Sequence, residues 1–235
     1  MKEEDPTNQP DSSNREQSLN IMKELCEREG TGGWEFAKKT MLDTPIVSTG
    51  LKRIIAQTMN QGRPDYFRPA LLSLCCKAVG GSSRATASLG AFFILTARAI
   101  GIHDDIIDHS KDKEGIKTIL GKYGQDSALI LSDILLFKSF TMLQKTLQLG
   151  VSAEELMGIL ATIDNTWTSE QSSAEALDLE HKNRFDLSPQ QCLIKITMVA
   201  SEIEAIARAG GILGRGSPPA LEVLGKYGRL LGTNA

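Results

Sequence analysis

The chain has 235 residues, of which 41% are hydrophobic and 23% are charged, and its formal net charge is −3. This composition favours a folded domain with a substantial core. The slightly acidic balance argues against a dedicated nucleic-acid-binding protein, which normally carries a basic face. The four cysteines lack zinc-ligand spacing, and the polar N-terminus has no apolar secretory signal, so we expect a cytoplasmic protein.

The first part of the chain is expected to form helices separated by Gly and Pro. Residues 1–17 are polar and predict a flexible tail. A helix is expected over Ser18–Glu29, where three glycines would end it: Gly30, Gly32 and Gly33. Thr44–Pro45 predicts the start of a second helix, and Gly62–Pro64 predicts a break before a third.

Helical signals continue to the end of the chain. Ser152 followed by Glu155 is a capping box, which predicts a helix start. The segment that begins at Ser188–Pro189 is expected to end at Gly210–Gly211. Further helix starts or helix bodies are expected at Ser82–Ser83, Gln125–Leu149 and Ser217–Pro219.

The whole pattern predicts an all-α protein. No segment shows strand alternation bounded by turn signals, so we expect one bundle of long helices over residues 18–235. Ala85–Ile102 is apolar enough to raise the question of a membrane span. Because this stretch contains Arg98 and runs directly into acidic residues, we expect a buried central helix and no transmembrane segment.

Three aspartates follow that apolar helix and are the sharpest local signal. On a helix, Asp104 and Asp108 would share one face, with Asp105 beside them. Carboxylates at a helix C-terminus are unfavourable, because the helix dipole is negative there. Bound Mg²⁺ would relieve this repulsion and could bridge to a diphosphate. The alternative is a solvated acidic turn, and the flanking His103 is expected to donate or accept a supporting hydrogen bond.

Several segments together resemble the all-trans polyprenyl diphosphate synthase family. IHDDIID at 102–108 is similar to the family's first aspartate-rich motif, and the segments around it match in family order and spacing. These segments are GRPDYFRPALLSLCCKAVGG at 62–81, GKYGQDSALILSDILL at 121–136, EALDL at 175–179 and GKYGRLLG at 225–232. The resemblance covers most of residues 45–235.

The resemblance implies an isoprenoid synthase-type bundle of long helices around a central cavity. It implies a trans-prenyltransferase of isoprenoid biosynthesis, which condenses an allylic diphosphate with isopentenyl diphosphate and uses Mg²⁺ as its cofactor. Asp104, Asp105 and Asp108 would be the metal ligands and the catalytic residues, and Arg68 and Lys113 would bind the substrates. A homodimer, or a heterodimer with another synthase subunit, is also implied. Ala99 is small and would leave the cavity floor open for a longer product.

The chain departs from the family pattern at the residues that would bind isopentenyl diphosphate. Family lysine, histidine and arginine positions fall on Asp65, Ala97 and Glu114, and the Lys-Thr pair falls on Met198–Val199. The family glutamine falls on Glu175. Lysines near the motif could compensate, although a solvated face is the simpler interpretation: Lys111, Lys117 and Lys122. Arg98 could likewise reach inward, although snorkelling or pairing with a carboxylate is the simpler expectation.

The family's second aspartate-rich motif would begin shortly after Ala235. We therefore expect the sequence to be part of a longer protein whose C-terminal helices are missing. Two further hypotheses stay open beside the synthase. One is a catalytically degenerate regulatory or binding subunit of a heteromeric prenyl synthase, and the other is a terpene cyclase-like enzyme that needs only the allylic site.

Overall fold

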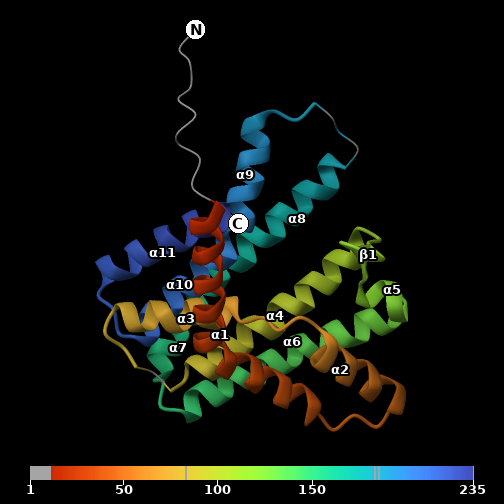
Figure 1. Ribbon diagram of the computed structural model, residues 1–235, viewed down its shortest axis with the longest axis horizontal. Coiled ribbons are helices and arrows are strands. Elements are labelled where there is room, and N and C mark those ends of the chain that lie inside the picture. Colours follow the sequence, from red (N-terminus) through yellow and green to blue (C-terminus); the bar gives the residue numbers. More distant parts are fainter. Residues whose placement is uncertain (1–11, 83, 183, 185, 235) are drawn as a thin grey trace.

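A computed structural model describes residues 12–82, 84–182, 184 and 186–234 of the chain, and the first eleven residues of the expected tail lie outside it. The described part is a bundle of α-helices (Figure 1). In chain order the elements are α1 (Ser12–Leu42), α2 (Thr49–Gln61), α3 (Phe67–Ala78), α4 (Thr86–Ile107), β1 (Asp112–Lys113), β2 (Ile116–Lys117), α5 (Ile119–Tyr123), α6 (Gln125–Gln148), α7 (Ala153–Thr162), the π-helical η1 (Ile163–Thr168), α8 (Ser169–His181), α9 (Pro189–Val199), α10 (Ser201–Leu213) and α11 (Pro218–Thr233).

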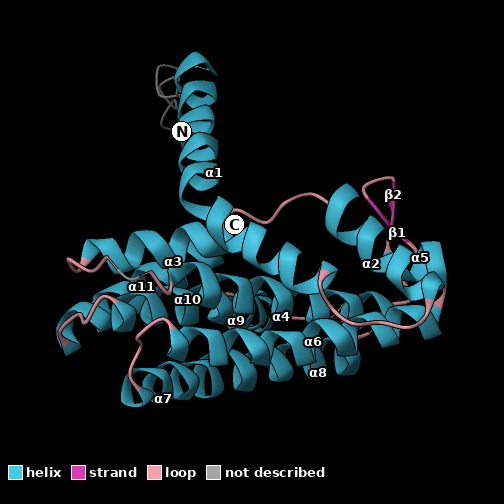
Figure 2. Ribbon diagram, turned by 90° about the horizontal axis from the view of Figure 1, so that it is seen from below, coloured by secondary structure: helices cyan, strands magenta, loops and turns pink. Residues whose placement is uncertain are grey.

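Helix α4 is the central element of the bundle. It packs against α1, α3 and α6. To one side of it, α10 packs against both α3 and α11. The N-terminal part of α1 stands away from the other helices (Figure 2). Helices α8 and α9 contact each other and extend together from the body (Figure 1). The all-α class expected from the sequence is confirmed.

The core is built on α4 because its side chains are apolar on almost every face. Leu89, Phe93 and Leu95 are all completely buried. By length and composition alone α4 could also cross a membrane, but 56% of the relevant window is buried inside the structure. Contacts with three neighbouring helices explain this apolar composition, and they agree with the expectation of a buried central helix.

The first helix is longer than the sequence predicted. Helix α1 begins at Ser12, inside the expected tail, and continues through the glycines that were expected to end it. A Cβ atom at Gly30 would lie 2.1 Å from the carbonyl oxygen of Tyr66, and one at Gly33 would lie 2.5 Å from the Cβ of Pro69. These glycines therefore allow α3 to approach α1 closely, and close packing outweighs their low helix propensity.

Three smaller expectations also need correction. Thr44–Pro45 does not open a helix, because α2 begins later, after the N-cap Ser48, whose side chain accepts a hydrogen bond from Leu51 N. The segment after Ser188 contains two helices, α9 and α10, and α10 continues past Gly210–Gly211 to Leu213. The expectation of no strands is wrong at one place, where β1 and β2 pair antiparallel in a hairpin of two residues per strand.

Local capping signals were more reliable. The capping box of Ser152 and Glu155 is present at the start of α7, with both reciprocal hydrogen bonds formed. Ser188 caps α9 in the same way, with Pro189 in the first helical turn. The break at Gly62–Pro64 separates α2 from α3 as expected. Each of these signals depends only on residues within one turn, so tertiary packing does not override it.

Glu29 joins α1 to α3 and gives a stability prediction. Its carboxylate accepts a hydrogen bond of 3.0 Å from Ser73 Oγ and pairs with Lys77 Nζ, and the Lys77 hydrogen bond contributes most to the lowering of its pKa. Because the folded-state pKa is lowered, this stabilisation is present above the unfolded pKa and is lost as the pH falls through the folded one.

We therefore expect Glu29→Gln to lower the free energy of unfolding by about 1–2 kcal/mol at neutral pH. The difference from the wild type should shrink in acid, as Glu29 becomes protonated in the folded state. Urea denaturation at neutral and acidic pH measures both effects. The exposed Glu24 of the same helix, changed to Gln, is the matched control, and an equal loss in both variants would contradict the prediction.

Candidate functional site

The three aspartates lie where α4 ends. Asp104 and Asp105 occupy the last helical turn and Asp108 is the C-cap residue. The amide of Asp108 donates to the carbonyl oxygen of Asp104 at 2.9 Å, and His109 then turns the chain away with a positive φ of 54°. Asp105 is buried, whereas Asp108 is exposed. The helix thus ends on three negative side chains in the region where its own dipole is negative.

Lys113 offsets part of this negative charge. Its ammonium nitrogen lies 2.8 Å from Asp104 Oδ2 and 2.8 Å from Asp105 Oδ1. The short hairpin after α4 brings this lysine back over the helix end, with Glu114 and Gly115 at positive φ in its turn. Burial alone would lower the pKa of Lys113, but hydrogen bonds and charge from Asp104 and Asp105 raise it above the ordinary lysine value.

The expected convergence of three carboxylates is not present in the described residues, where no three His, Cys, Asp or Glu side chains lie close enough together to hold a metal ion. Asp108 caps the helix, and Lys113 lies between the other two. The donor chemistry nevertheless fits Mg²⁺, which prefers a few carboxylates plus water and phosphate oxygens. The Lys113 ammonium marks the position between Asp104 and Asp105 that a cation favours. Within the described part of the chain, the contact with Lys113 is the one polar contact recorded for the buried Oδ1 atom of Asp105.

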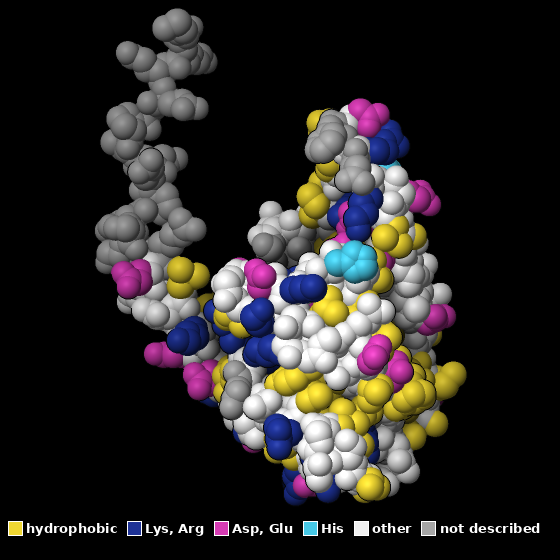
Figure 3. Space-filling model, turned by 90° about the vertical axis from the view of Figure 1, so that its right-hand side faces the viewer, with side chains coloured by type: hydrophobic (Ala, Val, Ile, Leu, Met, Phe, Trp, Pro, Cys, Tyr) yellow, Lys and Arg dark blue, Asp and Glu magenta, His cyan; other side chains and the backbone are white. Residues whose placement is uncertain are grey.

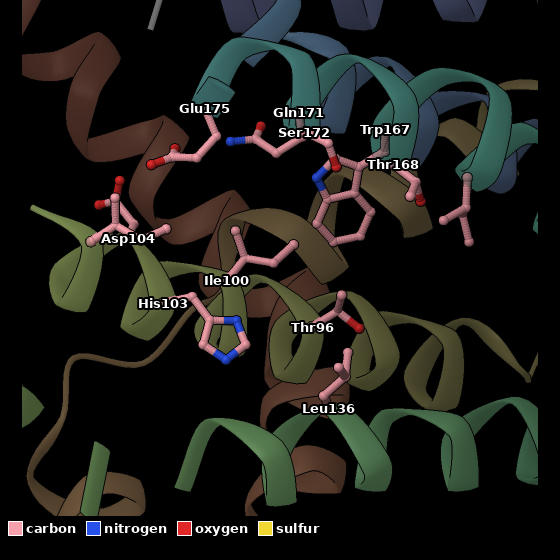
Figure 4. Close-up of a pocket in the computed structure, with 12 residues that line it drawn as sticks. Thr96, Ile100, His103, Asp104, Leu136, Trp167, Thr168, Gln171, Ser172 and Glu175 are labelled. Atoms are coloured by element: carbon pink, nitrogen blue, oxygen red, sulfur yellow. The ribbon is translucent and has the colours of Figure 1, made fainter. Parts of the chain in front are cut away.

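An apolar cavity of about 290 Å³ opens beside Asp104. Residues of α4 face residues of η1 and α8 across it (Figure 4). The apolar part of its wall includes Ile100, Ile107, Leu136, Ile163 and Trp167. Trp167 is held from behind by Phe93, with ring centroids 5.8 Å apart in a stacked arrangement. We call this space the apolar cavity; it could hold a hydrocarbon chain next to the aspartates.

Ala99, the residue expected to lie at the floor of a cavity, does not contact this one. The Ala99 side chain is completely buried. The cavity-facing positions of α4 include Thr96, Ile100 and His103, which lie on another face of the helix. His103 Nε2 lies 2.8 Å from Ser132 Oγ, which agrees with the supporting hydrogen bond expected for it. An effect of Ala99 on product length therefore stays a prediction, and Thr96 is the α4 side chain in direct contact with this cavity at its far end from Asp104.

Glu175 is a site residue that the sequence did not identify as functional. It lines the apolar cavity on α8, across from Asp104 (Figure 4). Desolvation raises its pKa most, and the negative charges of Asp104, Asp108 and Asp178 raise it further. A carboxylate that faces two aspartates of the motif adds negative charge where a cation would bind. The only sequence signal was its match to the family glutamine.

Arg68 is not free to bind an anion. Its Nε donates to Glu202 Oε1 at 2.6 Å, its Nη2 donates to Glu202 Oε2 at 2.9 Å, and its Nη1 donates to Asp65 Oδ2 at 2.7 Å. Burial would lower the pKa of this guanidinium, but hydrogen bonding and charge from Glu202, with the charge of Asp65, raise it. Glu202 lies far from Arg68 in the sequence, and no sequence motif predicted this contact.

Comparison with known proteins places the chain in the polyprenyl synthetase family. The polyprenyl synthetase family model matches residues 49–234. The chain is 29% identical over 167 residues to a geranylgeranyl diphosphate synthase of Methanosarcina mazei, covering 71% of this chain and 50% of that protein. It is 27% identical over 191 residues to the octaprenyl diphosphate synthase of Escherichia coli, covering 80% of this chain and 52% of that one. The chain thus spans about half the length of these relatives.

Solved structures show the same fold. A geranylgeranyl pyrophosphate synthetase from Pyrococcus horikoshii superimposes with a TM-score of 0.78 at 20% identity, covering 91% of this chain and 64% of that one. A polyprenyl synthase from Caulobacter crescentus, solved with calcium and isoprenyl diphosphate, superimposes with a TM-score of 0.72 at 20% identity, covering 89% and 61%. At this identity the likeness is one of backbone architecture.

Proposed function

The chain belongs to the polyprenyl synthetase family, and we propose that it is a trans-prenyltransferase of isoprenoid biosynthesis that condenses an allylic diphosphate with isopentenyl diphosphate. The observation that supports this most directly is the apolar cavity that ends at Asp104. A hydrocarbon chain in that cavity would place its diphosphate at the end of α4, beside Asp104, Asp105 and Lys113. We also propose that the protein acts in the cytoplasm.

In this proposal the residues of the chain have separate tasks. Asp104, Asp105 and Asp108 would hold Mg²⁺, which when bound would neutralise the charge of the departing diphosphate. Lys113 would leave the aspartates and contact the allylic diphosphate as a point charge. The apolar cavity walls would exclude water while the allylic carbon–oxygen bond breaks and the carbon–carbon bond to isopentenyl diphosphate forms. Loss of one proton completes the reaction.

The contact between Lys113 and the aspartates leads to a test of this arrangement. Lys113→Met is expected to tighten Mg²⁺ binding to the substrate-free protein by about three- to tenfold, because the ammonium no longer competes for Asp104 and Asp105. The KM for the allylic diphosphate should rise, because its point-charge partner is gone. Titration calorimetry measures the first effect and steady-state kinetics the second. Lys111→Met is the matched control, since Lys111 is also exposed and lies two residues away. Weaker Mg²⁺ binding in the Lys113→Met variant would contradict the proposed role.

The regulatory-subunit alternative is favoured by one observation. Arg68 is neutralised by Asp65 and Glu202, so the residue that the resemblance assigns to isopentenyl diphosphate is already occupied.

Exposed apolar side chains on α6, including Ile130, Phe137 and Phe140, would suit contact with a second chain. We propose that this face forms a dimer, with a second copy or with another synthase subunit. Hydrophobic side chains gather along one side of the view in Figure 3.

The test of the proposed function is incorporation of labelled isopentenyl diphosphate into a longer prenyl diphosphate. The complete protein would be incubated with allylic diphosphates of increasing chain length, with Mg²⁺ or with EDTA. Mg²⁺-dependent incorporation is the expected result. Incorporation that appears or changes only when a partner synthase is added would instead support the regulatory subunit. A hydrocarbon product formed without isopentenyl diphosphate would show a cyclase and would contradict both.

A further inference from the structure

The motif GKYGRLLG at 225–232 lies in α11, outside the site described above. Its glycines let α11 approach α10 very closely. A Cβ atom at Gly228 would lie 2.6 Å from the carbonyl oxygen of Ile203 and 2.8 Å from the Cα of Glu204. Arg229 follows this glycine directly, so the close packing brings its side chain to the place where α8, α9 and α10 meet.

Arg229 contacts all three of these helices. Its Nη1 and Nη2 atoms pair with the two carboxylate oxygens of Glu170 at the start of α8, and Nη2 lies 2.8 Å from Oε1. Its Nε donates to Glu204 Oε2 of α10 at 2.6 Å. Nη1 also donates to the backbone carbonyl oxygen of Thr197, in the last turn of α9, at 2.8 Å. A guanidinium can make these contacts together because its donors point in different directions from one rigid plane.

The charges around Arg229 are balanced and partly shielded from water. Glu204 is buried, and a second arginine, Arg208, donates from its Nε to Glu204 Oε1 at 2.7 Å. The hydrogen bond with Glu170 contributes most to the raised pKa of Arg229, and Glu204 raises it further against the effect of burial. Removal of either partner would leave a shielded charge without its counterpart.

Arg229 lies at the base of the α8–α9 hairpin, which extends from the body of the molecule (Figure 1). Glu170 is the second residue of α8 and Thr197 is close to the end of α9, so Arg229 holds both helices where they join the body. Other ion pairs of the described hairpin residues stay inside the hairpin: Lys195 with Asp178, and Arg184 with Asp186. Within the described chain, Arg229 therefore supplies the ion pair between the hairpin and the rest of the fold.

The base of the hairpin is also one wall of the apolar cavity. Gln171, Ser172 and Glu175 line the cavity and lie in the first two turns of α8, directly after Glu170 (Figure 4). The π-helical η1 precedes α8, and π-helical turns are places where helices bend. Continuity with α7 therefore does not fix the direction of α8 by itself, and the position of this wall depends on contacts such as the one with Arg229.

From this geometry we infer that Arg229 is a positioning residue for the allylic substrate: it holds the α8 wall of the apolar cavity in place against the α4 wall, without lining the cavity itself. The inference rests on the proposed function for the identity of that substrate. Glu175 of α8 and Asp104 of α4 face each other across the cavity (Figure 4). A shift of α8 would therefore change both the space for the hydrocarbon chain and the surroundings of its diphosphate.

The first test is hydrogen exchange, followed by mass spectrometry, on the complete protein without substrate. Arg229→Met should speed amide exchange in the α8–α9 hairpin by about tenfold or more, because the base of the hairpin loses its charged contacts. Exchange in α4 should stay as in the wild type. Glu170→Gln removes only the α8 contact and leaves Arg229 paired with Glu204, so it should act in the same direction and guards against misfolding of Arg229→Met.

The second test is calorimetric binding of farnesyl diphosphate in Mg²⁺, without isopentenyl diphosphate, so that no condensation takes place. Both variants should raise the Kd by about three- to tenfold at unchanged stoichiometry, because part of the binding free energy is then used to order α8. A purely structural role would lower the stoichiometry, since less protein would be folded, and would leave the Kd unchanged. In turnover, the KM for the allylic diphosphate should rise with the Kd while kcat at saturation stays close to the wild-type value.

The matched control is Lys226→Met, which breaks an exposed ion pair with Glu222 on the same helix and should change neither exchange nor binding. The inference is overturned if Arg229→Met and Glu170→Gln leave exchange in the hairpin unchanged, or if Lys226→Met raises the Kd as much as they do. A lower stoichiometry at an unchanged Kd would also overturn it. If the wild-type protein does not bind farnesyl diphosphate, the proposed function fails, and hydrogen exchange alone decides whether Arg229 positions the α8 wall.

Discussion

Replacing Asp104 with alanine is expected to lower Mg²⁺-dependent turnover by about 10³-fold, which makes it the largest effect on activity that the structure predicts. Asp104 is the aspartate that contacts both the apolar cavity and Lys113. Its removal would take away one proposed metal ligand and would leave Glu175 without the carboxylate that faces it. The carboxylate lost in the variant would hold the Mg²⁺ that neutralises the departing diphosphate.

The measurement is incorporation of isopentenyl diphosphate at saturating Mg²⁺, with thermal unfolding recorded for each variant. Asp112→Ala is the matched control, because Asp112 is an exposed aspartate of the adjacent hairpin and its loss changes the net charge equally. The fold of the Asp104 variant should survive, since relief of repulsion at the helix end offsets the lost ion pair with Lys113. Activity within tenfold of the wild type would remove Asp104 from the mechanism.

The fold was predictable at helix starts where a complete capping box is present, although not at Thr44–Pro45. The capping box at Ser152 and the Pro189 start depend on side chains within one helical turn, and both are present in the structure. The end of the first helix was not predictable, because Gly30 and Gly33 act through contacts with Tyr66 and Pro69. A glycine gives the same sequence signal whether it ends a helix or allows another helix to approach.

The same division holds for the site. The position of Asp104 and Asp105 at the end of an apolar helix follows from the sequence, and the structure has them there. The pairing of Arg68 with Glu202 could not be predicted, because the two residues lie 134 positions apart in the sequence. Arg98 illustrates the limit further: the simpler expectation was snorkelling or a carboxylate partner, whereas the structure gives it Trp34 and a backbone carbonyl.

Phe93→Ala is expected to have the largest effect on stability. It should also change the functional site, because Phe93 packs against Trp167 in the wall of the apolar cavity. Phe93 is completely buried, stacks on Trp167 with centroids 5.8 Å apart, and meets Phe92 edge-on at 5.2 Å. Removing its ring should lower the free energy of unfolding by about 3–5 kcal/mol, because the surrounding core cannot collapse into the space. Phe67→Ala removes the same atoms from an exposed position at the start of α3, outside the proposed dimer face, and should lower stability by clearly less.

The second consequence of Phe93→Ala concerns the cavity. Trp167 forms part of the wall of the apolar cavity and lies in the single π-helical turn of the described chain, so its ring depends on Phe93 for support. Without that support the cavity should deepen, and the products of a prenyl elongation should shift to longer chains. Urea denaturation and product analysis measure the two effects on one protein. A large loss of stability with an unchanged product distribution would show that Trp167 is held by other contacts.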